Sequence, residues 1–186
     1  MYLNHEPMKN TKLIFLLFCI LCASCNKNEL TRDKAKELIL KDHKYPYAFD
    51  WRIYCGDPDY GAKVMRTNLE EKGFVTLRRT YGWFNSGAFI SLTAKAKPYL
   101  LPTPEKDKVR KIQEVKLADV NFGEITGVKK NENGKNAIVE FSTYYTNPTP
   151  FAVLIPDKDF KKADTSRVYF SLYDDGWRMT PHFTFL

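Results

Sequence analysis

Residues 122–145, FGEITGVKKNENGKNAIVEFSTYY, decide the fold of this chain. Asn133 and Gly134 in their middle both tolerate positive φ, which is the signature of a tight turn between two β-strands. After the turn, Val139, Phe141 and Tyr145 fall on one parity, as in a strand that buries one face. The stretch therefore predicts an antiparallel β-hairpin.

The sequence around this hairpin predicts more strands and few helices. Turn signals at residues 147–150 and at Asp174-Asp175-Gly176 separate further runs rich in β-branched and aromatic residues. The additional expected strands are Val109–Asp119, Phe151–Ile155, Arg167–Tyr173 and Trp177–Met179. We expect residues 109–186 to form an antiparallel sheet of about five strands with one face on a core.

The preceding segment, residues 30–100, alternates helix and strand signals. Thr31 is an expected N-cap with Asp33 in the first turn, which predicts a helix as far as Asp42. A strand over Phe49–Tyr54 should follow, and Asp59 should cap a second helix. That helix should carry Leu69 and stop at Lys72-Gly73, before a hairpin of Phe74–Leu77 with Ala88–Leu92 and a helical turn in residues 93–100.

A stretch rich in proline and charge, LPTPEKDK at residues 101–108, is the expected boundary between these two segments. The predicted fold class is α+β. N-terminal helices with a small β-hairpin form one subdomain, residues 30–100, and the antiparallel sheet forms a second, residues 109–186.

The chain begins with the pattern of a secretory signal. Lys9 and Lys12 precede an apolar run, residues 13–22, which is followed by the small residues Ala23 and Ser24. A helix of this run covers about half of a ~30 Å hydrocarbon core, so a permanent membrane span is not expected. Met8 fits the start of such a signal better than Met1. An ordinary signal peptide and a short membrane helix are the alternatives.

The end of this segment, Cys22-Ala23-Ser24-Cys25, resembles the lipobox of bacterial lipoproteins, although leucine is commoner where Cys22 stands. The resemblance implies that residues 1–24 are removed as a signal peptide and that Cys25 receives diacylglycerol. Residues 25–29 would then be a lipidated tether, and Asn26 after the cysteine is compatible with transport to the outer membrane. The resemblance places the chain in the cell envelope, on its periplasmic or its outer face, held by acyl chains such as palmitate.

Residues 60–97 resemble a winged-helix module in the runs Leu69–Leu77 and Ile90–Lys97, although Ala96 stands where that module often has glycine and the element order differs. The resemblance implies that four cations, Lys63, Arg66, Arg78 and Arg79, contact a nucleic-acid backbone. A lipid-anchored protein outside the cytoplasm meets no genome, so we expect no nucleic-acid partner. The later sheet resembles uncharacterised envelope lipoproteins that end in an Asp-Gly-Trp turn, a resemblance that carries no functional residues.

The net charge and the number of cysteines limit the functions that the chain could have. The net charge is +7, and it becomes +6 without residues 1–24. This positive excess could favour binding to anionic lipid headgroups or envelope glycans. The alternative is a basic surface that is simply solvated. Cys55 is the single unmodified thiol of the expected mature chain, so a disulfide within it is excluded. Cys55 with His43 or His182 could form a nucleophilic pair, but a small apolar residue at the end of a buried strand is the favoured interpretation.

Other acidic residues have structural explanations. Asp57 and Asp59 suit a turn and a helix cap, since a calcium loop needs further acidic ligands. Glu124 and Glu140 lie on expected strands and could oppose each other, but outward-facing charges are usual there. The two distant histidines make zinc unsuitable, and the chain lacks phosphate-loop, Gly-x-Ser-x-Gly and His-Glu-x-x-His motifs. We expect no metal and no cofactor.

The remaining candidates are aromatic. Tyr81, Trp83 and Phe84 lie in an expected loop between strands, and such residues form interface hot spots and sugar platforms. The sequence thus predicts a membrane-anchored envelope lipoprotein that acts as a non-catalytic binding or scaffolding module, with envelope proteins or glycan as partners. The alternatives are an enzyme that uses Cys55 and a winged-helix nucleic-acid-binding module.

Overall fold

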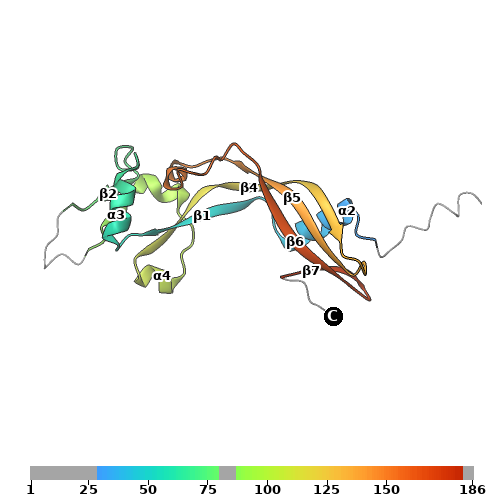
Figure 1. Cartoon of the computed structure of the whole chain (residues 1–186). Coiled ribbons are helices and arrows are strands. Elements are labelled where there is room, and N and C mark those ends of the chain that lie inside the picture. The colour runs from blue at the N-terminus through green and yellow to red at the C-terminus, as the bar shows by residue number, and fades with distance from the viewer. Residues whose placement is uncertain (1–28, 80–86, 182–186) are drawn as a thin grey trace, which may run out of the picture.

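The computed structural model describes residues 29–79 and 87–181. The fold class is α+β, as predicted, with a curled five-stranded antiparallel sheet and a separate two-stranded hairpin (Figure 1). The elements in chain order are α2 (Arg32–Asp42), β1 (Tyr47–Tyr54), α3 (Pro58–Met65), β2 (Val75–Leu77), β3 (Ile90–Leu92), η1 (Ala94–Tyr99), α4 (Glu105–Val109), β4 (Ile112–Lys130), β5 (Asn136–Thr146), η2 (Pro150–Leu154), β6 (Asp164–Tyr173) and β7 (Gly176–Thr180).

The large sheet has the order β1-β4-β5-β6-β7 and is built on one long strand, β4, of 19 residues. β1 pairs with its first part, from Tyr54 opposite Ile112 to Tyr47 opposite Val120. β5 pairs with its second part and continues to β6 and β7, so β4 connects two ends of an elongated molecule (Figure 1). The turn at Asn133-Gly134 is confirmed, and Gly134 has a φ of +69°.

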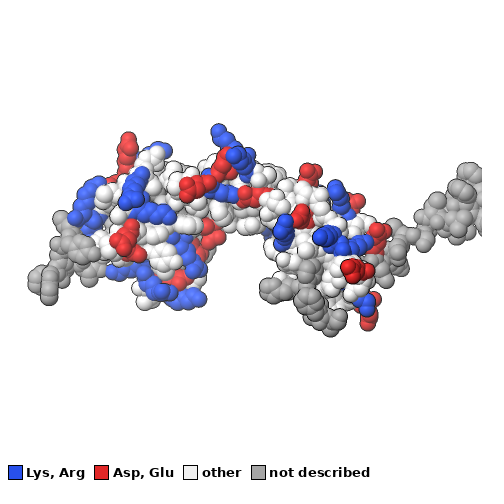
Figure 2. All heavy atoms as spheres, viewed as in Figure 1, with Lys and Arg blue, Asp and Glu red and all other residues white. Residues whose placement is uncertain are grey.

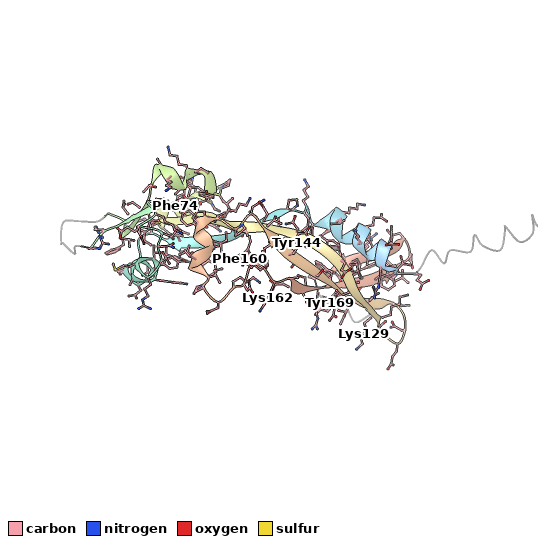
Figure 3. All side chains as sticks on the ribbon, turned by 90° about the horizontal axis from the view of Figure 1, so that it is seen from above. Phe74, Lys129, Tyr144, Phe160, Lys162 and Tyr169 are labelled. Carbon is pink, nitrogen blue, oxygen red and sulfur yellow. The ribbon has the colours of Figure 1, made fainter. Side chains whose placement is uncertain are left out.

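Two hydrophobic cores lie along this strand. The first, which we call the groove lobe, packs Val115 and Leu117 of β4 against α3, the β2–β3 hairpin and η2. The second, the helix lobe, packs Ile125 of β4 against α2 and strands β5 to β7. In Figure 3, Phe74 lies in the groove lobe and Lys129 in the helix lobe, at opposite ends of the molecule.

Helix α2 covers the sheet at the helix lobe. Its predicted cap is confirmed, because the Thr31 Oγ1 accepts a hydrogen bond from the backbone N–H of Lys34 at 3.2 Å. Ala35 and Ile39 lie one turn apart and are fully buried, and Leu30 just before the helix joins them in the core. Local capping and an apolar stripe thus place α2 correctly.

The sheet crosses the boundary expected at residues 101–108. β1 comes from the earlier segment but pairs with β4, and α2 packs on the later strands. Residues 105–109 form the short helix α4, and Val109, expected to begin a strand, is 80% exposed. β4 starts only at Ile112, because the chain first turns through Lys111 at a φ of +57°.

The predictions for the second helix and for residues 151–155 are wrong. Asp57, and not Asp59, caps the second helix, which ends at Met65 well before Leu69. Residues 151–155 do not form a strand: residues 151–154 belong to η2 and Ile155 ends it. Pro150 is at its start, and the Thr149 side chain accepts a hydrogen bond from the Phe151 N–H. The apolar residues in this segment serve the core, since Phe151 and Leu154 are completely buried. The fifth strand of the sheet is therefore β1.

Candidate functional site: a groove between α3 and β2

The groove lies between α3 and the chain that leaves β2. Asp57 fixes the start of α3, since its Oδ1 accepts hydrogen bonds from the backbone N–H groups of Asp59 at 2.8 Å and Tyr60 at 3.3 Å. Pro58 occupies the first turn, where a missing N–H costs nothing. The chain then returns through Gly73, whose φ of +73° suits glycine, and enters β2 beside the helix.

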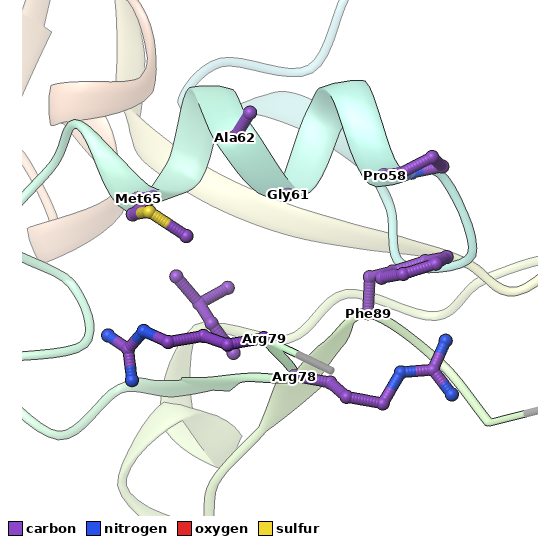
Figure 4. Close-up of a pocket in the computed structure, with 8 residues that line it drawn as sticks. Pro58, Gly61, Ala62, Met65, Arg78, Arg79 and Phe89 are labelled. Carbon is purple, nitrogen blue, oxygen red and sulfur yellow. The ribbon is translucent and has the colours of Figure 1, made fainter. Parts of the chain in front are cut away.

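The groove is mostly apolar and has a volume of about 310 Å³. Its lining residues are Pro58, Gly61, Ala62, Met65, Leu77, Arg78, Arg79 and Phe89. Figure 4 shows Met65 directed from α3 toward the chain after β2, with Phe89 below the other end of the helix. Gly61 is buried against Phe89, and a Cβ there would make ordinary van der Waals contact with the Phe89 Cβ at 3.6 Å, whereas the small side chain of Ala62 is exposed to the groove. Met65 is 51% exposed, so its side chain is accessible to a ligand in the groove.

One end of the groove carries the guanidinium of Arg79. Its Nη2 donates to Glu70 Oε2, while Glu70 Oε1 accepts from the backbone N–H of Leu77 at 3.0 Å. Glu70 therefore holds the outer edge of β2 and one side of Arg79 together. The Arg79 side chain remains 63% exposed, and a guanidinium has five N–H donors, so it retains donors for a second anion.

The other end of the groove carries Arg78. Its guanidinium carbon lies 4.3 Å from the centroid of the Phe89 ring, a cation–π contact. Figure 4 shows the guanidinium groups of Arg78 and Arg79 directed to opposite ends of the groove, with apolar side chains between them. The site thus combines an apolar lining with a positive charge at each end.

The positive charge of the chain is concentrated in this lobe. Residues 52–111 contain 12 Lys and Arg and six Asp and Glu, a net charge of +6. Residues 25–186 as a whole also carry +6, so the rest of that chain is neutral. In Figure 2, Lys and Arg gather around the end that holds α3 and α4, with fewer acidic groups between them. An anion approaching the molecule is therefore attracted to the groove lobe.

Cys55 has no features of an activated nucleophile. It follows β1 in the first core, and burial raises the pKa of its thiol to about 11. Its Sγ lies 3.7 Å from the carbonyl oxygen of Ile53. His43 ends α2 in the helix lobe, where its Nδ1 lies 3.0 Å from a carboxylate oxygen of Asp42. The structure therefore does not bring Cys55 and His43 together, and His182 lies outside the described residues.

Glu124 and Glu140, which could have opposed each other on neighbouring strands, do not do so. Glu140 lies opposite Gly127 and accepts a hydrogen bond from Arg167 Nε at 2.7 Å, whereas Glu124 lies at a β-bulge. The bulge shifts the register and separates the two side chains, so they do not form a carboxylate pair, and the favoured interpretation of charges on the outer face of the sheet remains. In residues 29–79 and 87–181 no group of His, Cys, Asp and Glu side chains is arranged to hold a metal ion.

The remaining predicted residues are only partly described. Cys25 and the aromatic residues Tyr81, Trp83 and Phe84 lie outside the described ranges. Among the four cations proposed for nucleic acid, Arg78 and Arg79 line the groove, while the Nζ of Lys63 lies 5.2 Å from the centroid of the Trp51 ring. No helix in the part of the chain that the structure describes has the length and apolar character needed to cross a membrane.

Comparison with known proteins finds no match among family models, curated proteins or solved structures. The groove itself was not predicted from the sequence. Met65 and Leu77 belong to runs that indicate core helix and strand, and only the chain reversal near Gly73 brings them to the same surface. The one local feature of the sequence that pointed to this site was the pair of adjacent arginines, Arg78 and Arg79.

Proposed function

We propose that the protein is a lipid-anchored lipoprotein of the bacterial cell envelope whose folded part is a non-catalytic binding module. The observation that carries the proposal is the sequence of residues 9–25, a basic start and an apolar run that end in Cys22-Ala23-Ser24-Cys25. Acyl chains on Cys25 would hold the domain at the membrane surface, because each buried methylene contributes about 0.8 kcal/mol.

The start of the fold supports a short attachment. Leu30 is buried in the helix lobe, and a carboxylate oxygen of Glu29 lies 3.6 Å from the Nζ of Lys130. The link from Cys25 to the folded chain is thus residues 25–29, which span about 17 Å when fully extended. A domain on such a link stays close to the bilayer, with the groove lobe at the far end of β4.

The binding role is supported by the groove and by the neutral thiol. A pocket of this size with a few charged groups suits a small ligand. A thiol with a pKa of about 11 is almost entirely protonated at neutral pH and is a poor nucleophile. Tyr81, Trp83 and Phe84 follow Arg79 closely in the chain and remain our predicted contacts for an envelope protein or a glycan.

The anchor is tested by metabolic labelling with a tagged fatty acid, followed by membrane fractionation. The comparison is wild type against Cys25→Ser, with Cys55→Ser as the matched control. We expect label and membrane association to depend on Cys25 and to be unchanged in the control. A protein that takes no label and stays in the cytosol would contradict the proposal.

The basic groove lobe favours one alternative, a winged-helix-like module that binds nucleic acid. Phosphate contacts through Lys63, Arg66, Arg78 and Arg79 would give duplex binding that weakens steeply with salt. Absence of duplex binding at low salt would eliminate this alternative, which also requires that the protein remain in the cytoplasm.

A further inference from the structure

We propose that the groove between α3 and β2 binds an anionic amphiphile, an acyl chain with a carboxylate or phosphate head. The inference rests on the proposed non-catalytic binding function and names its ligand class. The acyl chain lies along α3 between Met65 and Phe89, and the anionic head pairs with Arg79.

The shape and lining of the groove fit a single extended apolar chain. α3 has eight residues and is therefore about 12 Å long, and Pro58, Gly61, Ala62 and Met65 lie along its groove side. Ala62 is small and exposed, so a ligand can approach the helix closely at that position. Met65 at the open end is unbranched and adapts its shape to an apolar partner.

The positive charge at the groove favours a ligand with an anionic head group. Arg79 lies beside Met65, is largely exposed, and can donate two parallel hydrogen bonds to a carboxylate or phosphate. Glu70 already occupies one side of this guanidinium, so it competes with a ligand anion. The net charge of +6 in residues 52–111 adds a longer-range attraction for anions and repels cations.

Two other ligand classes fit the described groove less well. A peptide that adds a strand to β2 needs a free edge, but the carboxylate of Glu70 accepts the N–H of Leu77 there. A sugar needs an open aromatic face, but the lining contains one aromatic ring, Phe89, and the Arg78 guanidinium lies over it. An acyl chain requires neither.

The test measures binding of four probes by isothermal titration calorimetry: decanoate, decyl phosphate, decanol and decyltrimethylammonium. Decanol is used below its solubility limit and the other three below their micelle concentrations. The protein is the chain from residue 25 onward with Cys25→Ser, which contains every residue of both cores. We expect the two anionic probes to bind at least about tenfold more tightly than decanol, and the cationic probe to bind more weakly than decanol. The stronger of the two anions identifies the head group.

Variants locate the site. Arg79→Gln should weaken decanoate binding by about tenfold or more, whereas Arg66→Gln, which removes the same charge outside the groove, should change it less than twofold. Ala62→Trp places a large side chain in the groove from an exposed position and should abolish binding. Glu70→Gln keeps an oxygen for the Leu77 N–H but removes the competing charge, so it should tighten binding several-fold.

Equal binding of decanoate and decyltrimethylammonium would overturn the proposal, as would unchanged affinity in Arg79→Gln and Ala62→Trp. An acidic peptide that displaces decanoate and binds more tightly would assign the groove to a protein partner instead. Because the probe protein carries no acyl group, these results are independent of the labelling of Cys25. Failure of the anchor and failure of the ligand proposal are therefore distinguishable.

Discussion

Replacing Phe151 by alanine tests whether the two cores unfold as one unit. Phe151 is fully buried in η2, and its ring centroid lies 5.9 Å from that of Phe74 and 6.0 Å from that of Tyr99. Truncation of a buried phenylalanine costs about 3–5 kcal/mol, since it removes apolar contacts and leaves a cavity. For a chain of this length we expect the melting temperature to fall by roughly 6–20 °C.

The shared strand should transmit this loss to the helix lobe. β4 contributes Leu117 to the first core and Ile125 to the second, so unfolding its first part removes the support of its second part. Trp177 is 6% exposed in the helix lobe and reports on that core. In a Trp51→Phe, Trp83→Phe background, Phe151→Ala should lower the Trp177 fluorescence midpoint and the far-UV circular dichroism midpoint equally.

The matched control is Phe170→Ala, which removes the same ring from the fully buried position in the helix lobe. Both variants should shift one common transition by similar amounts. The reasoning is refuted if Phe151→Ala leaves the Trp177 midpoint in place while circular dichroism shows two steps. That result would mean that β4 does not couple the lobes.

Three other predictions concern single sites. The Lys158 ammonium lowers the pKa of Asp164 below its ordinary 3.8. The ion pair therefore stabilises the fold above pH 3.8, and this stabilisation is lost as the pH falls through the lowered pKa. Asp164→Asn should reduce the difference in urea midpoint between pH 7 and about pH 3. Cys55 should react with iodoacetamide only slowly until denaturant is added, since its thiol pKa is about 11, and rapid labelling of the folded protein would revive the enzyme alternative. Gly123→Ala should lower the free energy of unfolding by about 1–3 kcal/mol in urea titrations, because its Cβ would lie 2.9 Å from the Ser142 carbonyl oxygen; an unchanged urea midpoint would show that the bulge relaxes.

Local signals in the sequence predicted where several elements begin and turn. Thr31 caps α2 through its own side chain, and Gly134 and Gly176 adopt the positive φ values that their turns require. These preferences belong to the residue and its immediate neighbours, so they hold in most tertiary contexts. The alternation in residues 137–145 likewise identified β5 and its buried face.

The register of the strands and the positions of the β-bulges could not be predicted from local sequence. Glu124 and Glu140 both lie on strands, as expected, but a bulge near Gly123 separates them. The register of two strands depends on how they pack with their neighbours, and an inserted residue shifts every later pair. The end of α3 was also missed, because Leu69 is apolar at helical spacing and yet lies in the irregular chain beyond Met65.

The sequence by itself determined the α+β class and the hairpin around Asn133-Gly134, and it is the basis of the anchor that we propose at Cys25. Only the tertiary structure decided that β1, and not residues 151–155, completes the sheet, and that Met65 and Arg79 form one groove. The physical reason is that Phe151 and Leu154 can be buried from a short helix as well as from a strand. Which partner they meet depends on contacts far away in the chain, and the groove is made by such contacts alone.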